Sequence, residues 1–88
     1  MTYSLEYTPA ASRQLHKLDK SAQARLKPKI KALSENPRMP GAIKLQGFEN
    51  TYRLRVGDFR ILYEIHDDIL LVLIVEIGQR GKIYRRKK

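Results

Sequence analysis

The spacing of apolar residues divides the chain into a helical first half and a strand-rich second half. Residues 3–7 alternate between apolar and polar, which predicts a short strand. Thr8 and Pro9 follow as an N-cap and a proline at the first helical position, and they predict a first helix. A second apolar stripe at helical spacing begins after Ser21, a residue suited to N-capping, and ends before Asn36.

The second half alternates with the period of strands. Residues 37–50 contain two prolines and two glycines and predict a loop. Thr51–Val56 and Phe59–Ile65 then alternate, and Gly57-Asp58 between them suits a two-residue type II′ turn. Residues 69–77 are apolar except for one glutamate, which predicts a central strand covered on both faces. The order predicts an α+β fold, with two N-terminal helices packed on one face of a small, mainly antiparallel four-stranded sheet.

The two-residue turn fixes which residues of the hairpin stand opposite each other. Val56 pairs with Phe59, and Arg55 pairs with Arg60. Opposed residues share a face of the sheet. The face toward the helices then holds Tyr52, Leu54, Val56, Phe59, Ile61 and Tyr63. The other face gathers Arg53, Arg55 and Arg60.

Stability alone does not explain three arginines on one sheet face, because like charges directly opposite each other destabilise a sheet. The simplest interpretation of the three arginines is a solvated polar face of the sheet, without a ligand. We favour an anionic ligand, since the planar donor fork of arginine matches phosphate. Arg80 and Tyr84 follow the predicted central strand, and its end can bring them toward the same face. Tyr84 equally suits an anchor to the core.

Composition narrows the class of partner and the chemistry. The 88 residues include 18 Lys and Arg against 9 Asp and Glu, and the net charge of +9 indicates a polyanionic partner. The chain has no cysteine, and its two histidines are fifty residues apart, so we expect neither a thiol nucleophile nor a metal site, and no cofactor. No signal peptide is evident, and the apolar run is far shorter than the roughly 20 residues of a membrane-spanning helix. We therefore expect one cytoplasmic domain over residues 1–88, with a basic tail over 80–88.

Basic side chains also occur in the loop, in the tail and on the predicted second helix, where we expect Arg25, Lys27, Lys29 and Lys31 to form one basic face. The residues expected to contact RNA or the ribosome are Arg25, Lys27, Lys29, Lys31, Lys44, Lys82, Arg85 and Arg86. RNA carries its own nucleophile, the 2′-hydroxyl, so an arginine cluster that aligns and stabilises the phosphate can promote cleavage without a metal. A basic surface also binds RNA without cutting it, and composition leaves both options open.

Four segments occur in the order and spacing of a known family. They are Leu45-Gln-Gly47, Tyr52-Arg-Leu-Arg55, Gly57-Asp-Phe-Arg-Ile-Leu-Tyr63 and Ile77-Gly-Gln-Arg-Gly-Lys-Ile-Tyr84. Together with the first strand and the two helices, they resemble the RelE/ParE superfamily of bacterial toxin–antitoxin systems, and within it the RelE branch. The resemblance implies a RelE-like fold and a ribosome-dependent endoribonuclease that cuts mRNA in the ribosomal A site. Cleavage would leave a 2′,3′-cyclic phosphate and a 5′-hydroxyl.

The resemblance also implies catalytic roles for five residues. Arg60 matches the family arginine that contacts the scissile phosphate, and Arg80 matches one assigned to transition-state stabilisation or leaving-group protonation. Tyr84 matches the tyrosine that orients the substrate base and takes part in proton transfer. Arg53 and Arg55 stand where well-studied members carry lysines. Arginine is a poor base, so Arg53 and Arg55 can stabilise negative charge but not accept a proton. The general base therefore stays unassigned.

The partners that the resemblance implies are a cognate RelB-like antitoxin, the ribosome and mRNA. The toxin would be monomeric alone and hetero-oligomeric with its antitoxin. Two alternatives remain open. One is a ParE-like toxin of the same fold that inhibits DNA gyrase without nuclease activity, and the other is a basic RNA-binding module.

Overall fold

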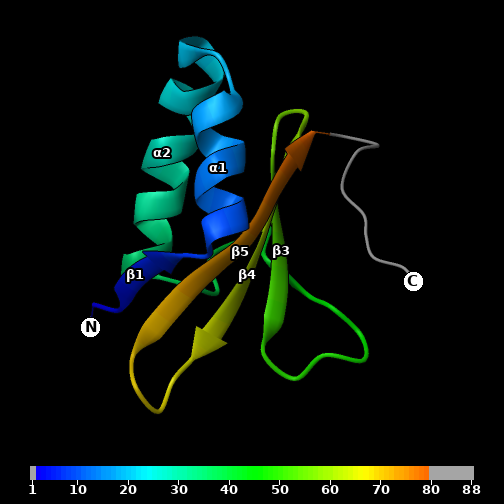
Figure 1. Ribbon diagram of the computed structural model, residues 1–88. Coiled ribbons are helices and arrows are strands. Elements are labelled where there is room, and N and C mark those ends of the chain that lie inside the picture. The colour runs from blue at the N-terminus through cyan, green and yellow to red at the C-terminus, as the bar shows by residue number, and fades with distance from the viewer. Residues whose placement is uncertain (1, 80–88) are drawn as a thin grey trace.

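Two helices and five strands make up residues 2–79, the part of the chain that the computed structural model describes (Figure 1). In chain order they are β1 (Ser4–Tyr7), α1 (Pro9–Lys17), α2 (Lys20–Glu35), β2 (Ile43–Lys44), β3 (Thr51–Val56), β4 (Phe59–His66) and β5 (Leu71–Gln79). The strands form one sheet in the order β1-β5-β4-β3-β2. β1 runs parallel to β5, and the other neighbouring pairs are antiparallel. The predicted α+β fold is confirmed, but the sheet has five strands and not four.

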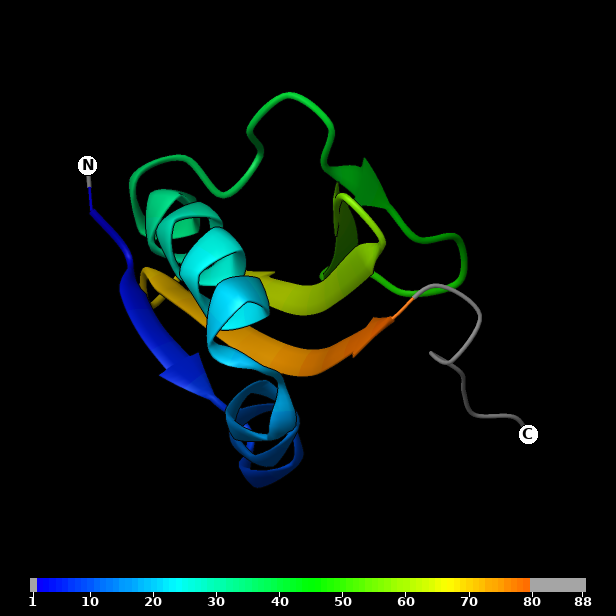
Figure 2. The same cartoon turned by 90° about the horizontal axis from the view of Figure 1, so that it is seen from above.

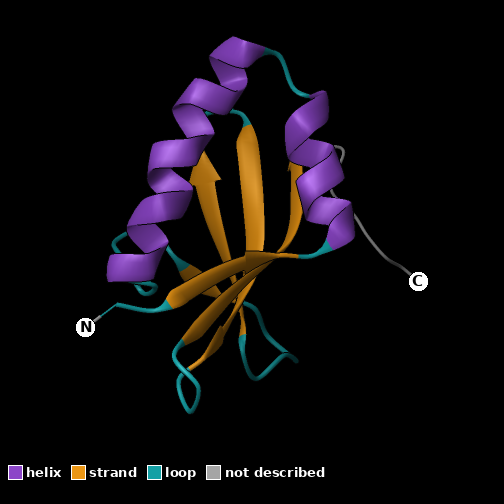
Figure 3. Ribbon diagram, turned by 60° about the vertical axis from the view of Figure 1, so that its left-hand side comes forward, coloured by secondary structure: helices purple, strands orange, loops and turns teal. Residues whose placement is uncertain are grey.

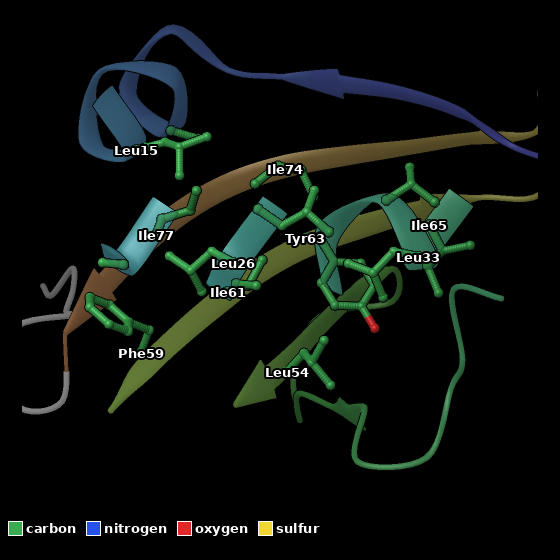
Figure 4. Packing of buried hydrophobic residues seen from close by; sticks show 14 residues of the cluster. Leu15, Leu26, Leu33, Leu54, Phe59, Ile61, Tyr63, Ile65, Ile74 and Ile77 are labelled. Atoms are coloured by element: carbon green, nitrogen blue, oxygen red, sulfur yellow. The ribbon is translucent and has the colours of Figure 1, made fainter. Parts of the chain in front are cut away.

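Both helices lie on one side of the sheet, as predicted (Figures 2 and 3). Leu26, Ile30 and Leu33 of α2 are fully buried. Leu26 lies over Ile61 and Tyr63 of β4 (Figure 4). Burying a side chain of this size stabilises the fold by about 1.5–3 kcal/mol. The apolar stripe of α2 therefore holds the helix against the middle of the sheet.

The fifth strand, β2, lies in the segment that was expected to be a loop. Ile43 pairs with Arg53 of β3, and Lys44 pairs with Tyr52. Gly41, at a φ of 95°, redirects the chain just before the strand. Two residues are too few to display the alternation that identifies a strand in a sequence.

The first residues of the helices are fixed by side-chain caps. The Ala11 N–H donates to Thr8 Oγ1 at 3.0 Å, which confirms the predicted cap of α1. The cap of α2 is Asp19 and not Ser21, because the Ala22 N–H donates to the Asp19 carboxylate at 2.8 Å. Both residue types are good N-caps, so sequence preference alone does not separate them.

β5 begins two residues later than the apolar pattern predicted. Ile69 and Leu70 belong to the turn before it, where Leu70 has a φ of 51° and Ile69 is 63% exposed. β5 is an interior strand of the sheet, as expected. The expectation that both its faces are covered is wrong for residues 2–79: Val72 is buried on the helix side, whereas Leu71 and Leu73 are only half-buried.

A polar cluster ties three segments together at the end of the sheet where β4 turns into β5. Arg38, just after α2, forms an ion pair with Asp67 at 2.8 Å. Tyr3 donates a hydrogen bond to the same carboxylate at 2.6 Å. These hydrogen bonds lower the pKa of Asp67 to about 2 from its usual 3.8, and the bond from Arg38 has the largest effect.

Replacing Asp67 with asparagine should make the stability of the protein less dependent on pH. Because the pKa of Asp67 is lowered in the folded state, its contribution is complete above about pH 4 and is lost as the pH falls toward 2. Asp67→Asn should therefore be less stable than the wild type at pH 7, with a difference that closes between pH 4 and 2. Urea denaturation across this range measures it, and a difference that stays constant with pH would contradict the assignment. The loss should be small beside that of a core truncation, since the pair is exposed.

Candidate nucleic-acid interface

The sheet face away from the helices, called the open face here, carries the three arginines of the hairpin. The register is the predicted one: Val56 pairs with Phe59, and Arg55 stands directly opposite Arg60. Arg53 pairs with Leu62 two residues further from the turn. Arg55 is exposed, and the other two arginines are half-buried. The structure thus brings Arg53, Arg55 and Arg60 together at one end of the sheet.

A bulge in β5 determines what stands beside Arg60. Leu62 pairs with Glu76 but Tyr63 pairs with Ile74, so Val75 is an extra residue in β5. An extra residue shifts the alternation of side chains along the strand by one position. Ile74 and Ile77, three residues apart, therefore both face the helices and are buried. It also places Gly78 opposite Arg60. The neighbouring strand therefore presents no side chain next to this arginine.

Arg53 has an unsatisfied hydrogen-bond donor. Its Nε is buried, and within residues 2–79 no group accepts a hydrogen bond from it. Its cross-strand neighbours are Ile43 and Leu62, which offer no acceptor side chain. Buried donors usually have a partner, so an anion or a water molecule at this position would satisfy Arg53.

The charge of the open face changes sign along the strands. Glu6, Glu64 and Glu76 lie on this face in strands β1, β4 and β5. Glu76 is level with Arg53, since both pair with Leu62, and Glu6 and Glu64 lie further from the hairpin turn. Glu64 and His66 form a hydrogen bond of 2.9 Å between Oε1 and Nε2. His66 is six residues along β4 from Arg60, which is roughly 20 Å in a strand. The carboxylate–imidazole pair is therefore too distant to act as a base on a phosphate held at Arg60.

Four basic residues of α2, which are Arg25, Lys27, Lys29 and Lys31, do not form one helix face. All are exposed, but the helical repeat of about 100° per residue separates them. Arg25 and Lys29 lie on the flank toward the hairpin, where the Arg25 guanidinium carbon lies 5.7 Å from the centre of the Phe59 ring. Lys27 and Lys31 lie on the opposite flank. The idea of a single basic face was wrong, because residues two apart point to different sides of a helix.

The remaining predicted contacts fall at the edges of the described region or beyond it. Lys44 is exposed on the edge strand β2, paired with Tyr52. β5 ends at Gln79, which pairs with Phe59 at the arginine end of the sheet. The residues that lie outside the described ones are Arg80, Lys82, Tyr84, Arg85 and Arg86.

Three features of the site were missed from the sequence. The Arg25–Phe59 contact joins elements far apart in the chain and leaves no local pattern. The position of Glu6 on the open face depends on the parallel pairing of β1 with β5, which is equally non-local. The β5 bulge was also missed, because residues 71–75 are all apolar and the sequence does not display the change of phase between the buried Ile74 and Ile77.

The arrangement can bind and polarise a phosphate, and Glu76 is the acidic residue nearest to the arginines in the register of the sheet. Within residues 2–79 no three metal-ligating side chains gather at one place. No helix of the described region is long and apolar enough to cross a membrane.

Comparison with known proteins identifies the family. The family model described as the ParE toxin of the type II toxin–antitoxin system matches residues 5–84. A putative RelE-like toxin protein of Escherichia coli is 34% identical over 93% of this chain and 87% of its own length. Toxin RelG of Mycobacterium tuberculosis is 33% identical over 98% of this chain and 100% of its own.

Solved structures agree with the sequence matches. The archaeal RelE–RelB complex from Pyrococcus horikoshii contains a chain that superposes with a TM-score of 0.80 at 27% identity, covering 94% of this chain and 100% of that one. The isolated RelE toxin of Escherichia coli gives 0.81 at 24% identity, covering 92% and 87%, and supports the fold alone. The chain therefore belongs to the ParE toxin family of type II toxin–antitoxin systems, in the RelE/ParE superfamily, and is a RelE-like toxin.

Proposed function

We propose that this toxin is a ribosome-dependent endoribonuclease that cleaves mRNA in the ribosomal A site and so inhibits translation in the cytoplasm. The observation that carries the proposal is the cluster of Arg53, Arg55 and Arg60 on the open face. The similarity to proteins named RelE agrees with it.

The reaction requires the 2′-hydroxyl of RNA, positive charge on the phosphate and two proton transfers. The 2′-oxygen attacks the adjacent phosphorus, the O2′–P bond forms and the P–O5′ bond breaks. The 2′-hydroxyl gives its proton to Tyr84 or to a water molecule, and the departing 5′-oxygen takes a proton from Arg80 or from water, which leaves a 2′,3′-cyclic phosphate and a 5′-hydroxyl. Arg60 binds the scissile phosphate, and Arg55 and Arg53 stabilise the charge that develops on its oxygens. No metal ion is needed, because the guanidinium groups provide the positive charge.

Two further roles are proposed for residues beyond the described region. Arg80 stabilises the transition state or protonates the leaving oxygen, and Tyr84 orients the substrate base and takes part in proton transfer. Lys82, Arg85 and Arg86, together with Lys27, Lys31 and Lys44, add long-range attraction to RNA.

Dependence on the ribosome follows from the shape of the site. An open sheet face holds a phosphate but does not force the 2′-oxygen into line with the P–O5′ bond, and such alignment can supply about 7–11 kcal/mol of a reaction barrier. The ribosomal A site would provide this alignment by fixing the mRNA.

A translating cell extract tests this function. Purified toxin should cut mRNA at codon-spaced positions in the extract and cut the same mRNA far more slowly when it is naked. The 5′ ends should carry hydroxyl groups. Intact mRNA in an extract given folded toxin would reject the proposal.

A gyrase inhibitor is the second candidate, because the matched family model is named for ParE. It has the same fold and needs no phosphate-binding arginines. A supercoiling assay with purified DNA gyrase separates the two functions: the endoribonuclease leaves supercoiling unchanged, and the gyrase inhibitor blocks it. A plain RNA-binding module would bind RNA with a steep salt dependence and show neither activity.

The proposed protein partner is a RelB-like antitoxin. Relatives of this chain have been solved in complexes named RelE–RelB, from Pyrococcus horikoshii and Methanococcus jannaschii. We propose that the antitoxin covers the arginines of the open face, and that the toxin is a monomer without it. Co-purification of the two proteins with loss of mRNA cleavage is the expected result.

A further inference from the structure

We infer that single-stranded RNA crosses the turn between β3 and β4, from the open face to the flank of α2. This inference rests on the proposed function and adds the path of the substrate. The surface involved, called the tip surface here, consists of Arg55 and Arg60 on the open face and Arg25 and Lys29 on α2.

The first support is the position of Arg25. Its guanidinium carbon lies 5.7 Å from the centre of the Phe59 ring, and its Nη1 lies 3.5 Å from the point that a Cβ on Gly57 would occupy. Phe59 is the residue next to Arg60, and Gly57 belongs to the turn itself. Within residues 2–79 no carboxylate forms an ion pair with Arg25. A charge with no acidic partner therefore stands at the turn, on the side of the sheet opposite Arg60.

The second support is the position of the basic residues around the axis of α2. Lys29 is four residues after Arg25 and only about 40° round the helix axis, so it continues the same flank. Lys27 and Lys31 are roughly 120–160° away from Arg25, and so is Lys20. One flank of α2 is thus joined to the arginine hairpin, and the other is not.

The third support is the distribution of acidic groups. Glu76 lies level with Arg53, and Glu6 and Glu64 lie further along the open face, so a phosphate chain that continued along the strands would meet like charge. Across the turn it meets cations on both sides, with a single acid, Asp58, between them. The favourable direction is therefore over the turn.

The geometry selects single-stranded RNA. Arg55 and Arg60 are each separated from the turn by one residue, so the path bends sharply around the end of a single hairpin. A single strand can follow such a bend and be held through its backbone, whereas an RNA duplex presents a broad, rigid surface. Binding of a duplex with equal affinity would contradict this part of the inference.

Charge reversal on the two flanks of α2 tests the path. The probe is a short, labelled 2′-O-methyl RNA strand, which lacks the nucleophile and stays intact. Lys29→Glu should weaken its binding to the full chain roughly five- to tenfold at about 100 mM salt, and flatten the salt dependence by about 0.7 in log–log slope. The matched control, Lys20→Glu, makes the same change in net charge on the opposite flank of the same helix and should alter binding less than about twofold. Equal losses in both variants would overturn the inference.

A second variant should gain affinity, an outcome that misfolding cannot produce. Asp58→Asn removes the acid in the middle of the tip surface and keeps a residue suited to the turn. Binding of the same probe should become about two- to threefold tighter. Unchanged or weaker binding would overturn the inference. Wild-type cleavage in the translating extract tests the proposed function separately, since it does not depend on where RNA leaves the arginines.

Discussion

Replacing Arg60 with alanine is expected to slow mRNA cleavage by about 10²- to 10³-fold, the usual effect of removing one group that stabilises an oxyanion. Arg60 is half-buried, and its partner on β5 is Gly78, which has no side chain to cover it. Single-turnover cleavage at saturating ribosome concentration measures the effect on the chemical step. Arg80→Ala should also lower cleavage strongly.

Arg60→Ala should not lower the stability of the protein, so misfolding would not explain a loss of cleavage in this variant. Arg55 and Arg60 repel each other across the hairpin, and removing one relieves a cost of about 0.2–1 kcal/mol. Arg60→Ala should therefore be as stable as the wild type or slightly more so. Arg13→Ala, an exposed arginine on α1, is the control and should cleave at the normal rate. Normal cleavage by Arg60→Ala, or equal losses in the two variants, would reject the site.

Replacing Ile61 with alanine is expected to reduce the free energy of unfolding by about 2–5 kcal/mol. Ile61 is 0% exposed, pairs with Leu54 and Ile77 and lies beneath Leu26 of α2 (Figure 4). Truncation removes buried apolar surface and leaves a cavity between the helix and the middle of the sheet. Total stability in small domains is typically about 5–15 kcal/mol, so the loss would be a large part of it.

Ile69→Ala provides the matched comparison. It makes the same chemical change in the turn before β5, where the side chain is 63% exposed, and should cost less than about 1 kcal/mol. Chemical denaturation of both variants measures the difference. Similar losses at the two positions would contradict the buried arrangement of β4 under α2.

The hairpin could be predicted in full because its register depends on local chemistry. Gly57-Asp58 fixes the turn, the turn fixes the pairs, and alternation assigns each residue to a face. The arginine cluster followed directly from this. β2 could not be predicted in the same way, because its two residues become a strand only by pairing with β3.

Predictions failed where two local signals had equal strength or where distant segments meet. Asp19 and Ser21 are both good caps, and only the structure decides between them. The basic residues of α2 were wrongly assigned to one face, although a helical projection of the sequence would have separated Lys27 from Lys29. Glu6 joins the open face through the pairing of β1 with β5, which are more than sixty residues apart in the chain. The roles of Arg80 and Tyr84 stay predictions.

The parallel pairing of β1 with β5 has a consequence for the synthesis of the toxin. Ser4 lies beside Leu71 and Tyr7 beside Ile74, so the sheet stays open until β5 has been made. Contacts between such distant segments form late in folding, because a long loop must first close. A nascent chain that has not reached residue 71 lacks the strand between β1 and β4, and its arginine hairpin has no sheet to hold it in place. A toxin directed at ribosomes would thus be inactive toward the ribosome that is still translating its first seventy residues.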